Sequence, residues 1–149
     1  MIRARKPKAD DAALLRIIRE ELVPLGPASQ REAWPDAALV DRLDRGTTYV
    51  WVPDEASRPR PRGFVTFRSH GRELFVDMLA IDRVYQGNGV GALLMNKAAR
   101  LGRKRGCRFV RLFVNEGNGQ GIRFYRKHGF YPVRYDAKNE GYVLEKRLG

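Results

Sequence analysis

The sequence predicts a single α/β domain spanning residues 1–149, with a mixed, mostly antiparallel sheet of six or seven strands and helices on both faces. Strand-like segments with short connections dominate the first half of the chain, which favours an antiparallel meander. Helical and strand-like segments alternate in the second half. A glycine-rich loop at residues 86–92 joins a strand to a helix, which is typical of a phosphate-binding turn inside an α/β sheet.

The chain opens with a short strand at Ile2–Arg5 and continues into a helix that Asp10 or Asp11 would cap. The apolar stripe of this helix consists of Leu14, Leu15, Ile18 and Leu22. The prolines and the glycine at positions 24–27 end it. A second, shorter helix is expected at Pro35–Arg45, with proline at its first position.

Three strands follow, because the helical spacing of apolar residues ends here and β-branched and aromatic residues become frequent. They are expected at Thr48–Val52, Gly63–Arg68 and Leu74–Ile81. The segment Pro53–Pro61 is rich in proline and charge and is predicted to be a solvated hairpin loop. A turn at Ser69–Arg72 separates the second of these strands from the third.

The second half begins with a helix at Val90–Arg105, which Gly106 ends. The side chains expected to be buried by this helix are Val90, Leu93, Leu94, Ala98 and Leu101. A strand at Cys107–Val114 is followed by a helix from Asn118 to Gly129. The chain then closes with a hairpin of two strands, Phe130–Tyr135 and Gly141–Leu148.

The net charge of +12 favours an anionic ligand, acidic partners or nucleic acid. The densest basic stretch comprises Lys97, Arg100, Arg103, Lys104, Arg105 and Arg108. This stretch is either a solvated helix face or a surface that attracts a polyphosphate toward the glycine loop. No helix-turn-helix, zinc-finger or aromatic RNA-binding motif accompanies the charge, so we do not expect a nucleic-acid partner.

The lengths of the apolar runs and the few cysteines and histidines exclude several classes of protein. No apolar run is long enough to span a membrane and no secretory signal is visible, so we expect a cytoplasmic protein without a membrane partner. Cys107 is the single cysteine, and the two histidines lie far from it in sequence. We therefore expect neither an intrachain disulfide nor a metal site.

The glycine loop, Gln86 to Ala92, reads Gln-Gly-Asn-Gly-Val-Gly-Ala. Backbone N–H groups that converge at the start of a helix bind phosphate. The loop also fits the dinucleotide pattern G-x-G-x-x-G/A, with Glu116 near the position of the expected acidic residue, or it is merely a tight turn. A dinucleotide fold is disfavoured, because too few strand–helix units follow the loop.

Two motifs in order resemble the GNAT superfamily of acyl-CoA-dependent N-acyltransferases. The first is Gln86-x-x-Gly89-x-Gly91, which matches the acyl-CoA loop of that family. The second, one helix and one strand later, is Asn118-x-x-Gly121-x-x-Phe124-Tyr125-x-x-x-Gly129-Phe130. The sequence departs from the family at Gly121, where alanine is usual, and this should loosen the helix slightly.

The resemblance implies acetyl-CoA as the acyl donor, held around a splayed pair of central strands. The residues that it assigns to the coenzyme are Leu79, Ala80, Ile81, Gln86, Gly87, Asn88, Gly89, Val90, Gly91, Ala92, Asn118, Phe124 and Tyr125. The loop would bind the pyrophosphate, and the end of the strand before it would pair with the pantetheine arm. Tyr125 matches the general acid of the family.

The reaction implied is acetyl transfer to a primary amine by direct attack in a ternary complex. Asp77 is a candidate base, because it is a charge inside an otherwise apolar strand; the alternative is an ion pair with Arg111 or another arginine, or a position open to solvent. Glu20 and Glu21 could instead face the amine. In this fold the acceptor is held by the early helices and the last hairpin, here around Glu21 to Trp34 and Tyr135 to Tyr142, and its identity stays open.

Two further interpretations stay open. The chain could be a non-catalytic module that binds a nucleotide, an acyl-CoA or a nucleic acid through the glycine loop and the basic helix. An exposed strand edge could also support a homodimer.

Overall fold

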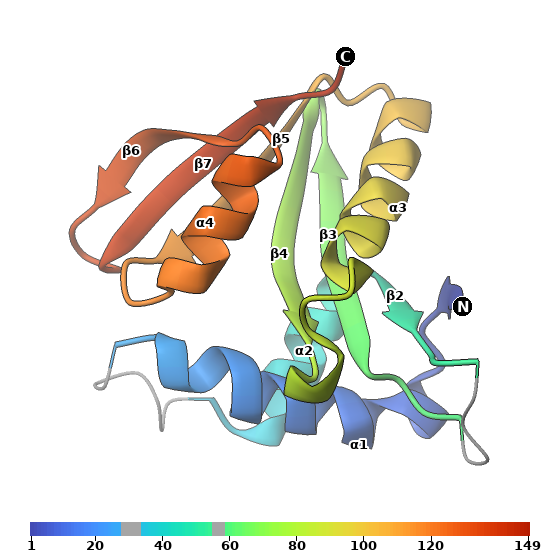
Figure 1. The fold of residues 1–149 in the computed structure, drawn as a ribbon. Helices are drawn as coiled ribbons and strands as arrows, with labels where there is room; N and C mark the ends of the chain where they lie inside the picture. The colour runs from blue at the N-terminus through green and yellow to red at the C-terminus, as the bar shows by residue number, and fades with distance from the viewer. Residues whose placement is uncertain (28–33, 55–58) are drawn as a thin grey trace.

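Seven strands form one sheet in the computed structural model, which describes residues 1–27, 34–54 and 59–149. The strands are β1 (Ile2–Ala4), β2 (Thr47–Trp51), β3 (Gly63–His70), β4 (Glu73–Ile81), β5 (Phe109–Asn115), β6 (Tyr131–Asp136) and β7 (Gly141–Arg147). Their order across the sheet is β1-β2-β3-β4-β5-β7-β6 (Figure 1). Among these strands only the β4–β5 pair is parallel, so the predicted mixed, mostly antiparallel sheet is confirmed.

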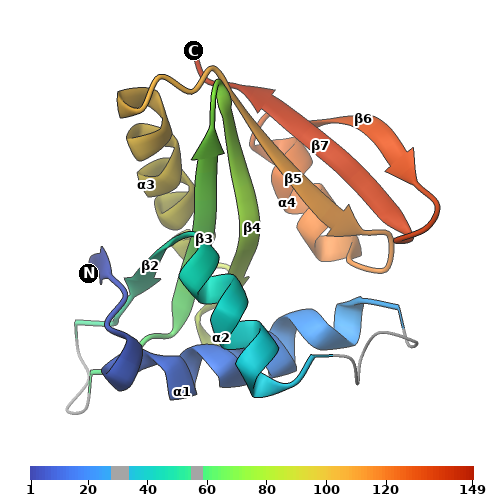
Figure 2. The same ribbon diagram turned by 180° about the vertical axis from the view of Figure 1, so that it is seen from behind.

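In the described part of the chain, four α-helices cover the two faces of the sheet (Figure 2). They are α1 (Pro7–Ile17), α2 (Asp36–Arg45), α3 (Val90–Lys104) and α4 (Gly119–Lys127). On one face, α1 and α2 pack on β2, β3 and β4 around Leu14, Leu39 and Phe64. On the other face, α3 and α4 pack around Phe67 and Leu94. Among the described helices none is long and apolar enough to cross a membrane.

A β-bulge divides β4 at Asp77. Thr66 of β3 faces Met78 and the next residue, Phe67, faces Val76, so Asp77 has no partner on β3. The parallel pairing with β5 also ends here, since its last pair is Val76 with Leu112. From the bulge onward β4 and β5 separate, which is the splay that the resemblance implied.

The start of α1 differs from the prediction. The helix begins at Pro7 with Lys6 as its N-cap residue, so neither Asp10 nor Asp11 is the cap. The reason is that proline is suited to the first helical position, where its missing N–H costs nothing. Asp10 instead lies in the first turn and accepts the Lys6 amide at 2.7 Å.

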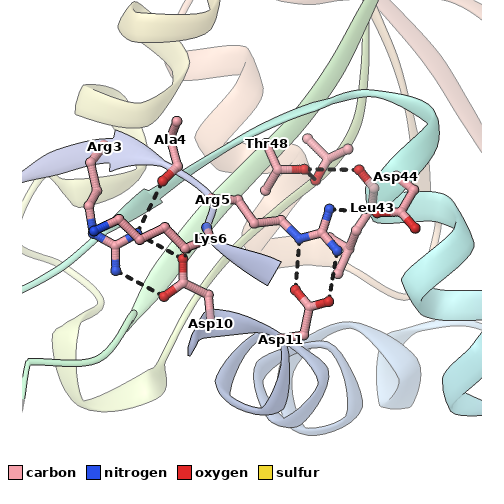
Figure 3. A network of polar contacts seen from close by, with 10 residues as sticks. Arg3, Ala4, Arg5, Lys6, Asp10, Asp11, Leu43, Asp44 and Thr48 are labelled. Atoms are coloured by element: carbon pink, nitrogen blue, oxygen red, sulfur yellow. Dashed lines mark hydrogen bonds and ion pairs between the residues drawn. The ribbon is translucent and has the colours of Figure 1, made fainter. Parts of the chain in front are cut away.

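Arg3 of β1 and Arg5, which directly follows this strand, anchor the helix (Figure 3). Arg3 makes a bidentate pair with Asp10 at 2.8 and 2.9 Å. Arg5 bonds both oxygens of Asp11 at 2.7 Å and reaches Asp44 of α2 at 2.8 Å. Because Asp10 is 1% exposed, its ion pair is the most deeply buried part of this network.

Other boundaries shift by a few residues. α2 begins at Asp36 with Pro35 as its N-cap, and β3 continues through His70, so the turn to β4 is shorter than predicted. β5 begins at Phe109, two residues after the buried Cys107. Leu93 is 52% exposed and was wrongly expected in the core. The predicted loop at 53–61 lies partly outside the described residues, at 55–58.

The first helix does not simply stop. After Ile17 it continues as a π-helical segment at Ile18–Leu22, followed by a 3₁₀ turn at Val23–Leu25. Segments of π-helix are rare and often accompany functional sites. Here the segment contacts the splayed end of β4 and carries Glu20 and Glu21.

Candidate active site

The glycine loop takes a shape that only glycine tolerates without strain at two of its positions. Gly87 and Gly89 have φ of +81° and +80°, in the left-handed region. Gly91 needs its small size for another reason: a Cβ there would lie 3.2 Å from the Phe124 ring. Gly89 is also the N-cap of α3, and no side chain caps this helix. The N–H groups of its first turn therefore point outward without an intrahelical acceptor.

Gln86 fixes this loop to three other segments. Its Nε2 atom donates to the Ile81 carbonyl at 2.8 Å and to the Glu21 carboxylate at 3.0 Å. Its Oε1 atom accepts from Gln120 of α4 at 3.3 Å. Since both amide protons of Gln86 are used in these contacts, its side chain holds the loop in place, and the backbone N–H groups are what the loop offers a ligand.

The separation of β4 from β5 exposes polar backbone. Leu79, Ala80 and Ile81 pair with β3 on one side, but past Val76 no residue of β4 pairs with β5. Backbone groups on that side of β4 have no partner strand. An extended ligand that carries amides can satisfy such groups as an added strand does.

A cleft of about 680 Å³ runs through this opening to the side of the sheet that α2 covers. The early segments and the last hairpin, which the sequence assigned to the acceptor, both contribute to it, through Leu22, Val23, Leu25, Gly26, Pro27, Trp34, Asp136, Asn139 and Val143. The described residues of these segments thus meet at one site. The sequence reasoning missed α2, which adds Asp41, Arg42 and Arg45 to the wall, and Arg68 of β3.

Asn118 and Tyr125 line this cleft from the start and the middle of α4. Asn118, near which the sequence places the start of this helix, is the N-cap of α4, and its Oδ1 accepts the Gly121 amide at 2.8 Å. The Tyr125 ring meets the rings of Phe124 and Phe130 edge to face, with centroids 5.3 and 5.5 Å away. Its hydroxyl has no hydrogen bond to any described residue, and burial raises its pKa. The hydroxyl therefore stays protonated at neutral pH.

Asp77, the residue at the bulge, also lines the cleft. Its partner is Arg42 of α2, which reaches Oδ1 at 2.8 Å and Oδ2 at 3.2 Å. The Arg42 guanidinium also lies 4.9 Å from the centroid of the Trp34 ring. The alternative partner, Arg111, is instead engaged by Glu73 at 3.0 Å and Glu145 at 3.3 Å. The pairing joins residues on two elements far apart in sequence, so no local pattern predicts it.

The other carboxylates considered as bases are differently placed. Glu20 is exposed. Glu21 has a side chain only 13% exposed, and it is bonded to Gln86. Its contacts connect the π-helical segment Ile18–Leu22 with the glycine loop.

The combination of a splayed strand pair, a glycine loop at the start of α3 and a tyrosine on α4 can be compared with known proteins. The sequence model of the Acetyltransferase (GNAT) family matches residues 13–130. The chain belongs to the GNAT acetyltransferase family. The predicted membership is thus confirmed, and so is the fold class of this GNAT protein.

Several relatives resemble this GNAT domain. An uncharacterized N-acetyltransferase of Methanocaldococcus jannaschii is 42% identical over 50 residues, which span 34% of this chain and 22% of that protein. The crystal structure of PaiA N-acetyltransferase from Thermoplasma acidophilum, in complex with coenzyme A, gives a TM-score of 0.83 at 20% identity, covering 99% and 98% of the two chains. Ard1 from Thermoplasma volcanium gives 0.77 at 26% identity, covering 99% and 96%.

Proposed function

We propose that this protein transfers the acetyl group of acetyl-CoA to a primary amine, by direct attack of the amine while both substrates are bound. The observation that carries the proposal is the opening between β4 and β5, which leads from the coenzyme side of the sheet into the cleft beneath α2. Family membership supports acetyl transfer, and the PaiA structure with coenzyme A supports the donor. The proposal treats residues 1–149 as one catalytic domain.

The coenzyme side consists of the glycine loop, the end of β4 and α4. The backbone N–H groups of residues 86–92 would bind the pyrophosphate, favoured by the positive end of the α3 dipole. Residues 79–81 would pair with the pantetheine arm as a neighbouring strand does. Asn118, whose Nδ2 has no partner among the described residues, would donate to the same arm. Phe124 covers Gly91 and would close the floor of the site.

Tyr125 would act as the general acid. When the amine attacks the thioester carbon, the C–N bond forms, the C–S bond breaks and the departing thiolate needs a proton. A neutral hydroxyl without a protein partner can supply it, and burial keeps this hydroxyl neutral by raising its pKa. Backbone donors at the splay would stabilise the oxyanion of the tetrahedral state.

Asp77 would take the proton that the acceptor ammonium loses, directly or through water. It lines the cleft together with Arg42 and Trp34, which supports this role. Arg42 occupies one lone pair on each of its oxygens and leaves the others available. Asp77→Asn is expected to change the pH–rate profile on its lower-pH side; a profile that matches the parent removes Asp77 from the mechanism.

The test begins with calorimetric titration of acetyl-CoA, followed by thiol release with amino acids, polyamines, aminoglycosides, lysine peptides and peptides with free N-termini. We expect micromolar binding of acetyl-CoA, weakened by Gly89→Val because that position needs a positive φ. At least one amine class should release thiol. Binding without release on any amine would instead favour a module that senses acyl-CoA, and no binding would refute the proposal.

A further inference from the structure

Six cationic side chains gather at the end of the molecule opposite the glycine loop. This basic end consists of Arg72, Arg103, Lys104, Arg105, Arg108 and Arg147, all exposed. Figure 1 shows the last turn of α3, the β3–β4 turn, the start of β5 and the C-terminus at the same end of the sheet. Folding thus brings together charges that lie far apart in the sequence.

Backbone contacts hold these segments together. The Arg108 amide donates to the Arg72 carbonyl at 2.7 Å, and the Leu148 amide donates to the Arg108 carbonyl at 2.8 Å. The Cys107 amide donates to the Gly102 carbonyl at 2.9 Å, which ties the end of α3 to the start of β5. The spacing of the cations is therefore fixed by the sheet and by one helix end.

The charge of the basic end is not neutralised within the described residues. None of its six cations forms an ion pair with a described carboxylate. The chain contains no aspartate or glutamate from Arg83 to Asn115. The nearby Glu73 and Glu145 are both engaged by Arg111. Cations in the last turn of α3 do complement its dipole, but that leaves Arg72, Arg108 and Arg147 unexplained.

The coenzyme does not explain this charge either. The 15 residues of α3 rise about 1.5 Å each, so the basic end lies about 22 Å from the glycine loop. At physiological salt this is well beyond the Debye length of about 8 Å. The patch therefore lies beyond the reach of the coenzyme phosphates and is open to a separate polyanion.

The chemistry of the patch favours the backbone of a nucleic-acid duplex. Protein interfaces depend on apolar or aromatic anchors at their centre. The exposed large apolar side chains, Met1, Val84, Leu93, Tyr131, Val133 and Tyr135, all lie outside the segments of the basic end. Single strands bind by stacking bases on aromatic rings, which these segments do not expose. Phosphate contacts need only fixed cations, and five of the six here are arginines, which bind phosphate bidentately.

We propose that the basic end binds the phosphate backbone of a nucleic-acid duplex, without reading its sequence. A nucleic-acid partner was not expected from the sequence, because it lacks a recognition motif, but contacts to phosphates need no such motif. This surface is separate from the acetyl-transfer site and would bring the enzyme to an acceptor near nucleic acid. The proposal does not depend on acetyl-CoA binding, so each can fail without the other.

The test is fluorescence anisotropy with labelled 20-base-pair duplexes of DNA and RNA, titrated at several salt concentrations. We expect a logarithmic plot of the binding constant against salt with a slope of about −3 to −5, because each neutralised phosphate contributes about −0.9. The triple variant Arg103→Glu, Lys104→Glu and Arg108→Glu should weaken binding at least about tenfold. The matched control is Arg123→Glu, Arg126→Glu and Lys127→Glu on exposed positions of α4, which changes the net charge equally.

The control variant should bind within about threefold of the parent at 100 mM salt, where distant charges are screened. Equal losses of affinity in both variants would mean that net charge alone is responsible, and they would overturn the assignment of the basic end as the binding surface. A salt slope near zero, or binding only to anionic lipid vesicles or to a polyglutamate peptide, would overturn the nucleic-acid assignment. Thermal unfolding of both variants checks that they fold.

Discussion

The contact between Glu21 and Gln86 gives a prediction about coenzyme affinity. Glu21 accepts from the loop residue Gln86 at 3.0 Å, and the exposed fraction of its side chain is 13%. Glu21→Ala removes this acceptor, whereas Glu21→Gln removes the charge and keeps an oxygen acceptor. The difference between the two variants therefore isolates the hydrogen bond from the carboxylate charge, which by itself repels the coenzyme phosphates.

The magnitude follows from the value of one partly buried hydrogen bond, about 1 kcal/mol. If that bond holds the loop in its binding shape, the Kd for coenzyme A should be about fivefold higher for Glu21→Ala than for Glu21→Gln. Isothermal titration calorimetry with coenzyme A measures both values. The neighbouring Glu20 is exposed, so Glu20→Ala and Glu20→Gln should give equal Kd values.

Two outcomes would refute this reasoning. Equal affinities of Glu21→Ala and Glu21→Gln would mean that the contact does not organise the loop. A fivefold ratio between the two Glu20 variants would mean that the effect arises from any side chain at this helix end, not from the contact with Gln86.

Three other predictions concern Tyr125, Asp10 and α4. Tyr125→Phe should lower kcat about 100-fold or more in thiol release with little change in coenzyme affinity, because only the proton donor is lost. Burial alone would raise the pKa of Asp10, but the bonds from Arg3 and the Lys6 amide outweigh it and lower the pKa. The stability that Asp10 contributes should therefore be complete above about pH 5 and should decline as the pH falls below about 4, measured as the difference in urea unfolding between the parent and Asp10→Asn. A Cβ at Gly121 would lie 2.4 Å from Asn118 Nδ2, so Gly121→Ala should gain about 1 kcal/mol of helix propensity but lose a cap of similar value. In an Asn118→Ala background the full gain of about 1 kcal/mol should appear in the free energy of unfolding.

Each of these has a contradicting result. An unchanged kcat in Tyr125→Phe would leave the ring as a packing group only. A stability difference for Asp10→Asn that stays constant down to pH 3 would show that its ion pair does not stabilise the fold. If Gly121→Ala stabilises both backgrounds equally, Asn118 moves aside at no cost and the expected conflict does not exist.

The sequence correctly predicted those parts of the fold and site that depend on short local patterns. The glycine loop and the Asn118 cap depend on neighbours within a few residues, so periodicity and turn chemistry located them. The final hairpin was found within two residues for the same reason. Leu93 was misplaced because α3 buries residues four apart, Val90, Leu94 and Ala98, and Leu93 lies beside that stripe.

The features that escaped prediction depend on contacts between distant segments. An ion pair of Asp77 with an arginine was one of the expected alternatives, but its partner Arg42 lies 35 residues away, and only the packing of α2 against the sheet brings the two together. The six cations of the basic end come from four separate stretches of chain. A bulge leaves no trace in composition, since the extra residue only shifts the alternation by one.

Asp77 is the extra residue of that bulge, so the packing of β4 does not require it. Without it, Val76 and Met78 would still face Phe67 and Thr66. Each side chain of β4 would stay on the face of the sheet where it packs now. A chain that lacks Asp77 should therefore fold, with a straighter β4 whose parallel ladder to β5 extends past Val76 and narrows the cleft. One residue thus both marks the point where β4 and β5 separate and supplies a carboxylate that lines the cleft between them.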